Sequence, residues 1–473
     1  MPNIYKLVPL LCLSLLQACT MAPTYVRPDA PIPNVYAAGG KDASGNEVNV
    51  SEYADAANMP WQEFFKDGPM RRVVELALAN NRDLRVSMLN IEKTRAEYRI
   101  QRADLLPTVN AVGASTNQHL PADLSSTGMK GMSRQYSASL GFSSFELDLF
   151  GRIRSLTEQA LESYYSVEEE AKSACLSLVA ETAAMYLQLV SDRELYDITE
   201  ATLKNREKNL DIIQHKFSAG VVSDLDVNQA KTLVEEARVN LAASATRVGQ
   251  DENHLCLLMG VPLPADLPEV RRLADVTPLP DLPAGLPSVL LERRPDIRAA
   301  EHVLKGANAN IGAARANFFP RISLTGDLGK MSADYNDLFD AGSRAWSFLP
   351  QISLPIFDTG RNVARLEASN AERDIAVARY EKAIQTAFRE VADSLVQREH
   401  IGMQLAAQDS LTATSRNSYD LSSKRYDAGV SSYINVLDAQ RSLYLAERDL
   451  ISTRLLRESN ALMLYKALGG GWE

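Results

Sequence analysis

The side chains that most often carry out chemistry are scattered along this 473-residue sequence. Histidine is a common acid–base catalyst and metal ligand. None of the five histidines has metal-ligand spacing: His119, His215, His254, His302 and His400. The sequence contains no glycine-rich phosphate loop, nucleophile elbow or zinc-protease motif. Asp and Glu fall mostly on expected helix faces, which is typical of a solvated surface. We therefore predict no catalytic residue, no metal site and no bound cofactor, and we expect the protein not to be an enzyme.

One residue is placed for covalent chemistry. Cys19 ends the run Leu–Gln–Ala–Cys, which resembles a bacterial lipobox. The apolar core before it, Leu7–Leu16, is about ten residues long and too short to cross a bilayer of roughly 30 Å. We expect residues 1–18 to be removed and Cys19 to carry S-diacylglycerol and an N-acyl chain. Thr20, in place of the Asp that retains many lipoproteins at the inner membrane, favours outer-membrane sorting. The alternative is an ordinary signal peptide with an incidental cysteine.

The net charge narrows the classes of partner. The chain carries a formal charge of −10 and is 45% apolar. Nucleic-acid binding needs a basic stripe that neutralises phosphates, so we expect no nucleic-acid partner. Ordinary solubility is an equally good explanation of the acidic balance.

The chain contains a long internal duplication. Ala103–Pro107 returns as Ala316–Pro320, 213 residues later, and Phe217–Val221 returns as Tyr426–Val430, 209 residues later. A repeat of this length, with its landmarks in the same order, predicts two copies of one structural unit.

Each copy is expected to run helix, two strands, long helix, turn, helix. In the first copy we predict a helix over 71–106, strands around 108–118 and 135–147, and then helices of about 67 and about 38 residues on either side of Val221. Residues at seven-residue spacing along the longer helix indicate a coiled-coil seam: Leu189, Tyr196, Leu203, Leu210 and Phe217. The second copy repeats the pattern, with a helix over 296–318, strands near 322–328 and 346–356, and helices on either side of Gly429.

These elements suggest a division of the chain into five segments. Residues 20–50 are rich in Pro, Gly, Ala and Asn without periodicity, which predicts an extended tether instead of a packed element. The expected boundaries are a signal peptide at 1–18, a lipidated tether and equatorial segment at 19–70, a first repeat at 71–260, a proline-rich connector at 261–295, and a second repeat at 296–473.

The alternating strands suit a membrane barrel with a wet interior, although strands of a soluble sandwich would alternate in the same way. Four strands per chain cannot close a barrel around a channel, and open strand edges are not tolerated in lipid. Three copies of four strands would give twelve, enough to enclose water. The pattern therefore predicts an oligomer.

Five motifs are similar to those of TolC-like outer-membrane efflux proteins, in particular the lipoprotein branch that serves resistance–nodulation–division multidrug pumps: Arg294–Glu301, Ala309–Arg315, Thr386–Asp393, Val436–Arg441 and Tyr465–Trp472. The resemblance covers essentially the whole mature chain. It implies a mainly α fold, in which a homotrimer forms a twelve-strand barrel in the outer membrane and a twelve-helix coiled-coil tunnel in the periplasm. It also implies two partners, a periplasmic adaptor and an inner-membrane resistance–nodulation–division transporter.

The resemblance also implies a gate at the periplasmic mouth of the tunnel. The tyrosine of the family's latch falls on Tyr426 and its aspartate partner on Asp226, whereas the family's arginine position holds Ser431. The constricting aspartate pair falls on Asn435 and Asp438, so that only Asp438 keeps a charge. An alternative reading makes Asp438 a surface carboxylate near a turn.

The two turns between the long helices are expected at the far end of the tunnel, as contacts for the adaptor. Their residues are Ala219, Gly220 and Val221 in the first copy and Ala428, Gly429 and Val430 in the second.

The preferred function is a passive exit duct for multidrug efflux. The same fold could serve protein secretion or metal-ion efflux. A hypothesis of a different class is a lipid-anchored periplasmic coiled-coil scaffold without a pore.

Overall fold

The computed structural model describes residues 20–33, 36, 59–124, 128–280, 282, 291 and 293–470. Cys19 and the expected signal segment 1–18 lie outside the described residues. The chain divides into two compact units. One comprises 1–29, 90–168 and 299–380, and the other comprises 30–89, 169–298 and 381–473. The two units are described separately.

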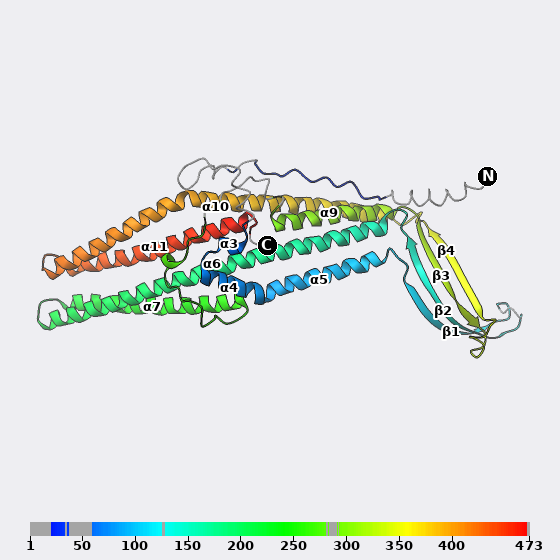
Figure 1. Ribbon diagram of the computed structural model, residues 1–473, viewed down its shortest axis with the longest axis horizontal. Coiled ribbons are helices and arrows are strands. Elements are labelled where there is room, and N and C mark those ends of the chain that lie inside the picture. Colours follow the sequence, from blue (N-terminus) through cyan, green and yellow to red (C-terminus); the bar gives the residue numbers. More distant parts are fainter. Residues whose placement is uncertain are drawn as a thin grey trace. The chain divides into compact units, whose positions relative to one another are not determined.

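The first unit contains one four-stranded antiparallel sheet (Figure 1). Its strands are β1 (Val109–Leu120), β2 (Gly131–Leu147), β3 (Arg321–Ser332) and β4 (Arg344–Ser353), in the order β1-β2-β3-β4. The first copy supplies β1 and β2, the second supplies β3 and β4, and pairing of β2 with β3 joins the copies. Among the described residues, β1 and β4 therefore each have one unpaired edge.

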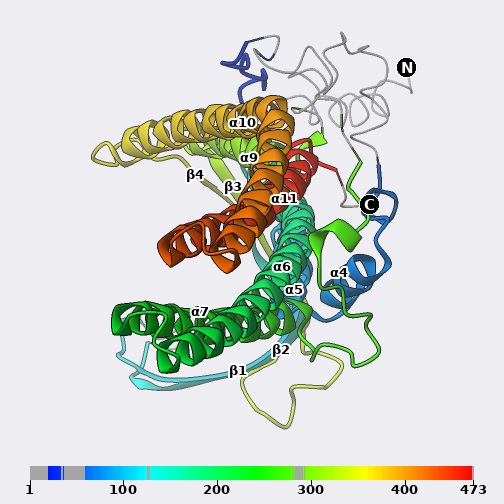
Figure 2. The same cartoon turned by 90° about the vertical axis from the view of Figure 1, so that its left-hand side faces the viewer.

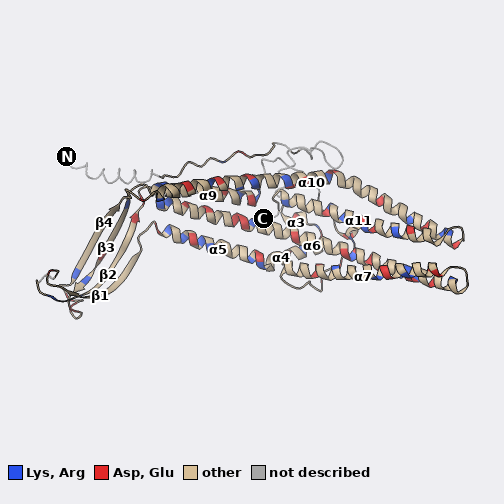
Figure 3. Cartoon of the chain, turned by 180° about the vertical axis from the view of Figure 1, so that it is seen from behind, with Lys and Arg blue, Asp and Glu red and all other residues tan. Residues whose placement is uncertain are grey.

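The sheet exposes many apolar side chains. In β4, Trp346, Phe348 and Ile352 are 74%, 54% and 70% exposed, and in the register between β3 and β4, Trp346 lies opposite Leu328. Figure 3 shows few charged residues on the strands and many along the helices. An exposed apolar sheet surface of this kind is typical of a membrane or protein interface.

An N-terminal strap, defined as residues 20–27, packs against α9 (Pro295–Ala316), where we had expected an unpacked tether. Asn308 Nδ2 donates to Pro23 O at 2.7 Å, and Arg315 Nη1 donates to Met21 O at 3.3 Å. A Cβ built on Gly312 would come within 2.7 Å of Ala22 N, so the absence of a side chain lets the strap approach the helix. For residues 20–27 the expectation is wrong, because proline-rich composition does not reveal contacts made by backbone carbonyls, and residues 37–50 of the expected tether lie outside the described residues.

The second unit is built from helices. It contains α3 (Trp61–Phe64), α4 (Gly68–Asn80), α7 (Asp224–Met259), the 3₁₀ turn η2 (Leu273–Asp275) and α11 (Tyr433–Ala467). The boundary between the units falls within four helices, namely α9, α5 (Arg82–Ala103), α6 (Arg152–Ser218) and α10 (Arg361–Asp427). Figure 2 shows α6 with α7 and α10 with α11 as two hairpins. The duplicated helix–strand–strand–helix unit predicted from the sequence is thus confirmed.

The two long helices contain 67 residues each, which matches the length predicted for the first. Among the described residues, α6 alone contains an 18-residue stretch apolar enough to cross a membrane by length and composition. Because 56% of that stretch is buried and a core helix passes the same test, this is weak evidence for a membrane helix.

The single helix expected over 71–106 is broken at Asn81. This residue ends α4 with an extended ψ of 132°, and its side chain starts α5, because Asn81 Oδ1 accepts from Leu84 N at 2.9 Å. Its Nδ2 also donates to Leu258 O at 2.9 Å. One buried amide therefore ends one helix, caps the next and ties both to α7.

The helical unit closes around an aromatic core. Phe64 stacks on Tyr465 with ring centroids 3.9 Å apart, and Phe65 packs edge-on against Phe64. Tyr465 Oη donates to Met59 O at 2.8 Å, which satisfies its one polar atom. The segment around α3 is thereby fixed to the last turn of α11.

Candidate functional site

The two hairpin tips have the same closing geometry. In the first tip, Gly220 N donates to Phe217 O and Val221 N to Lys216 O, both at 2.9 Å. In the second, Gly429 N donates to Tyr426 O and Val430 N to Arg425 O, again both at 2.9 Å. This pair of bonds is the Schellman motif, which needs a left-handed residue after the helix. The two glycines supply it, with φ of 73° and 72°.

Both tips present an apolar side chain to their surroundings. Val221 is 71% exposed and Val430 is 69% exposed, although the residue at this place in the motif often packs back on its helix. Here the residue that it would cover is Lys216 or Arg425. A Cβ built on Gly220 or Gly429 has no described residue within 4 Å. The two glycines are therefore needed for their backbone angle and not for space.

The helices that follow the two turns begin differently. Ser223 and Asp226 form a capping box at the start of α7, in which Ser223 N donates to Asp226 Oδ2 at 2.9 Å and Asp226 N to Ser223 Oγ at 3.3 Å. In α11 the residues 209 positions later are Ser432 and Asn435. Ser432 makes no capping bond with its side chain, and Asn435 Nδ2 instead donates to Ser431 Oγ at 2.8 Å. The duplication has kept the turn and changed the cap.

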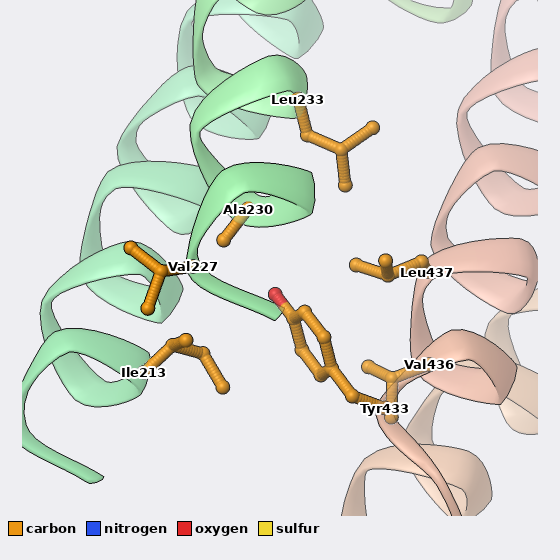
Figure 4. Close-up of a cluster of buried hydrophobic side chains, with 7 residues drawn as sticks. All are labelled: Ile213, Val227, Ala230, Leu233, Tyr433, Val436 and Leu437. Atoms are coloured by element: carbon orange, nitrogen blue, oxygen red, sulfur yellow. The ribbon is translucent and has the colours of Figure 1, made fainter. Parts of the chain in front are cut away.

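A buried apolar cluster lies below the tips and joins the two hairpins (Figure 4). Leu233 of α7 faces Leu437 of α11 in this view, and the ring of Tyr433 projects toward α7. Tyr426 of α10 packs at the edge of the cluster. The complete set of buried side chains is Ile213, Val227, Ala230, Leu233, Tyr433, Val436 and Leu437.

Tyr426 occupies a polar seam between the hairpins. Lys216 Nζ lies 4.2 Å from the centre of its ring, a distance that suits a cation–π contact, and the Tyr433 ring lies 5.2 Å away. Tyr426 Oη is buried and forms no hydrogen bond with the described residues. Burial, followed by the charges of Asp226 and Asp427, raises the pKa of Tyr426. Burial and then Tyr426 raise the pKa of Tyr433 to about 12. Both phenols are therefore neutral donors at neutral pH.

The residues expected to form the gate are only partly brought together. Asp226 lies near enough to Tyr426 for its charge to affect that phenol, yet its Oδ2 accepts from Ser223 N and from Ser223 Oγ, the latter at 2.7 Å. Asn435 and Asp438 are exposed on α11. Within one chain, the carboxylate of Asp226 thus acts as a helix cap, and the proposed hydrogen bond to Tyr426 is not formed.

Three residues at this site were missed in the sequence. Tyr433 is the largest side chain of the buried apolar cluster below the tips. Lys216 lies over the ring of Tyr426, and Ser223 caps α7. The Ser–x–x–Asp spacing of Ser223 and Asp226 is a recognisable capping signal. The sequence offers no comparable signal for Lys216 or Tyr433, because their contacts cross from one hairpin to the other. Among the described residues, no group of three or more His, Cys, Asp or Glu lies close enough to hold a metal ion.

The sequence matches a known protein family and several known relatives. A family model described as "Outer membrane efflux protein" matches residues 73–261 and 286–470. The toluene efflux pump outer membrane protein TtgC of Pseudomonas putida is 47% identical over 458 residues, which is 97% of this chain and 94% of TtgC. The antibiotic efflux pump outer membrane protein ArpC of Pseudomonas putida gives the same identity and coverage.

A solved structure agrees with the fold of this chain. The open state of the MtrE outer membrane channel of Neisseria gonorrhoeae superposes with a TM-score of 0.86 at 37% sequence identity. The superposition covers 96% of this chain and 99% of MtrE.

Proposed function

Because the chain belongs to the outer membrane efflux protein family, we propose that it is the outer-membrane channel of a tripartite multidrug efflux pump. In this role it is a passive exit duct and carries out no reaction of its own. The names of its relatives assign toluene and antibiotics to their pumps. We therefore propose that this chain passes small apolar and amphipathic molecules out of the cell.

The open sheet is the observation that carries this proposal. A strand edge with unpaired N–H and C=O groups is costly in lipid, where no water can satisfy them. β1 and β4 each leave one edge unpaired, and the sheet between them exposes large apolar side chains. Three copies joined β4 to β1 would close a twelve-strand barrel with an apolar outer surface. The trimer is thus the smallest assembly that both removes the edges and leaves room for a channel.

The helical hairpins supply the remainder of the duct in this proposal. Two hairpins from each of three chains give twelve helices, which would continue the barrel through the periplasm. The six exposed tips around Gly220 and Gly429 would then meet a periplasmic adaptor, and the adaptor would connect them to an inner-membrane resistance–nodulation–division transporter. Exposed Val221 and Val430 support a docking role, because an apolar side chain at a turn gains by being covered.

The N-terminal segment is proposed to anchor the trimer. Cys19 would carry the diacylglycerol and N-acyl chains, and the strap that begins at Thr20 would hold the anchor beside α9. The five segments divided at residues 18, 70, 260 and 295 remain our proposal for the organisation of the chain, with the gate residues in its two repeats.

A planar bilayer tests this function directly. Purified full-length chain should form trimers and should produce discrete single-channel currents. A coiled-coil scaffold without a pore would give trimers and no current, and that result would overturn the proposed duct. Expression in a Pseudomonas putida strain that lacks TtgC should restore toluene tolerance if the chain serves solvent efflux, whereas a duct for protein or metal-ion export would leave tolerance unchanged.

A further inference from the structure

A polar cavity of about 250 Å³ lies in the first unit, where the strands meet the helices. The ends of β2 and β4 and the beginnings of β3, α6 and α10 all contribute to its lining. Its charged lining consists of the arginines Arg152, Arg321, Arg361 and Arg365 and the carboxylates Glu146, Asp148 and Asp358. The proposed duct makes no use of this cavity.

In the first repeat, Arg152 has its ion-pair partner within the chain. Arg152 forms a two-pronged pair with Glu146, in which both N–O distances are 2.7 Å. Arg321 Nε also lies 3.3 Å from Glu146 Oε2. One carboxylate therefore serves two arginines on this side of the cavity.

In the second repeat, the corresponding arginine lacks such an ion-pair partner. Gly360–Arg361 is the duplicate of Gly151–Arg152, but the residue six positions before Arg361 is Pro355, where the first repeat has Glu146. Asp358 caps the start of α10 instead, since its two oxygens accept from Gly360 N at 3.1 Å and from Asn362 N at 2.9 Å. Arg361 and Arg365 are exposed, and within the described part of the chain their side chains have no ion-pair partner.

Apolar side chains follow β4 at the edge of the cavity. Ile356 and Phe357 lie in sequence between the lining residues Pro355 and Asp358, and they are 94% and 86% exposed. Phe319 lines the cavity and stacks on Phe150 with centroids 4.8 Å apart. A cavity with two unpaired guanidinium groups and an exposed apolar segment at its edge matches a ligand that has an anionic head and a hydrocarbon tail.

We propose that this cavity binds the phosphate of a membrane phospholipid, with Arg361 and Arg365 as its ligands. Arginine binds phosphate through parallel charge-assisted hydrogen bonds, and the acyl chains would cover Ile356 and Phe357. The inference rests on the proposed function, which places the junction of strands and helices at the inner edge of the outer membrane. Three sites per trimer would attach lipid to the base of the barrel.

The test measures lipid retained by the detergent-purified, full-length trimer in native mass spectrometry. The key variant combines Arg361→Gln with Arg365→Gln. The matched control combines Arg373→Gln with Arg379→Gln, which removes the same charge from the same helix outside the cavity. Delipidated protein is then offered dioleoyl-phosphatidylglycerol, dioleoylglycerol without phosphate, or inorganic phosphate.

The proposal expects phospholipid binding to fall about tenfold or more in the key variant, as for loss of a charge-assisted contact, and to stay unchanged in the control. Arg361→Lys with Arg365→Lys should retain intermediate binding, because charge remains and the fork is lost. Equal binding of dioleoylglycerol would overturn a phosphate site. Binding of inorganic phosphate as tight as that of the lipid would overturn the lipid as its source.

Two further readouts separate this inference from the proposed function. The key variant could fail to form trimers. If the lysine variant then forms trimers and binds as much lipid as the matched control Arg373→Gln with Arg379→Gln, the two arginines serve contacts between copies and the lipid site is wrong. Conducting channels with undiminished lipid in the key variant would overturn the inference alone. Absence of current from the unmodified protein would overturn the duct itself.

Discussion

Arg27 holds Glu301 with both prongs of its guanidinium, although the two residues lie 274 positions apart in the sequence. Nη2 lies 2.6 Å from Oε2, and Nε lies 3.0 Å from Oε1. Tyr25 Oη adds a third donor at 3.1 Å. The Glu301 side chain is only 6% exposed, so the strap is attached to α9 through a carboxylate that would be poorly solvated without these partners.

Attachment of the strap should weaken in acid. Burial would raise the pKa of Glu301, but hydrogen bonds from Arg27 and the charge of Lys305 outweigh it, and the net pKa lies below the ordinary 4.5. A carboxyl group whose pKa is lowered on folding contributes stability above its unfolded pKa and loses that contribution as the pH falls through the folded value. The protection of residues 20–29 against hydrogen exchange, measured relative to the intrinsic exchange rate at each pH, should therefore fall below about pH 4.5. In Glu301→Gln this protection should be low at every pH, whereas Glu372→Gln, at an exposed site on α10, should behave as the unmodified protein does.

Lipid attachment should depend on Cys19 alone. Cys19→Ser should abolish labelling of the mature protein by radioactive palmitate, because no other residue can form the thioether. The trimer should still be recovered from membranes, since the sheet has its own apolar surface. Labelled palmitate on the serine variant would contradict the lipobox assignment.

Adaptor docking should be sensitive to the backbone angle at the tips. Gly429→Val forces a β-branched residue into left-handed backbone angles, at a cost of roughly 1–2 kcal/mol. Gly429→Asn should be tolerated, because asparagine adopts these angles more readily. We expect the valine variant to form trimers but to cross-link less to the adaptor and to lower drug tolerance, and we expect the asparagine variant to resemble the parent. Equal cross-linking of the two variants would place the docking surface elsewhere.

The closed state of the channel should depend on the charge of Asp226 and not on the part that Asp226 takes in capping α7. We propose that the closed trimer forms the hydrogen bond between Tyr426 and Asp226 that the single chain lacks. Tyr426→Phe with Asp226→Ala should then raise resting conductance, since a hydrogen bond to a charged group contributes about 1.5–3 kcal/mol per copy. Ser223→Ala disrupts the same capping box and keeps the carboxylate free for Tyr426, so it should leave conductance unchanged. If Ser223→Ala opens the channel as much as the double variant does, helix capping explains the gate.

Cation preference should follow Asp438. In a trimer this exposed carboxylate would occur three times around one mouth, and a ring of negative charge favours cations. Asp438→Ala should therefore reduce the permeability ratio of K⁺ over Cl⁻, measured from reversal potentials under a salt gradient. Asp393→Ala, which removes an exposed charge from α10, serves as the control. A ratio that is unchanged by Asp438→Ala would support the reading of this residue as an ordinary surface carboxylate.

The long elements were predictable because their signals are periodic and repeat. The absence of proline between Gly151 and Pro262, together with seven-residue spacing, predicted α6 at its observed length of 67 residues. Alternation predicted all four strands, although β2 begins at Gly131 and β4 ends at Ser353, a few residues from the expected positions. Strand ends are set by pairing with neighbours, which local alternation does not contain.

The missed features depend on single polar contacts between distant segments. Asn81 breaks a periodic helix because its amide bonds to Leu84 and to Leu258 O. The strap is fixed by Glu301, Asn308 and Arg315 of α9. These three residues are spaced along one face of the helix, but the proline-rich segment that they bind has no matching periodic pattern from which the contact could be predicted. The tip residues were found through the duplicated glycine turn, but the contact of Lys216 with Tyr426 required the two hairpins to be placed side by side.

The difference between the two helix caps has a consequence for stoichiometry. A partner that recognises only the shape of the Schellman turns would meet six equivalent positions around a trimer, because the φ values of the two glycines differ by one degree. A partner that senses charge would meet three, since Asp226 in one tip corresponds to the neutral Asn435 in the other. Counting the adaptor copies bound to the unmodified trimer and to Asp226→Asn would tell which of the two symmetries the partner follows.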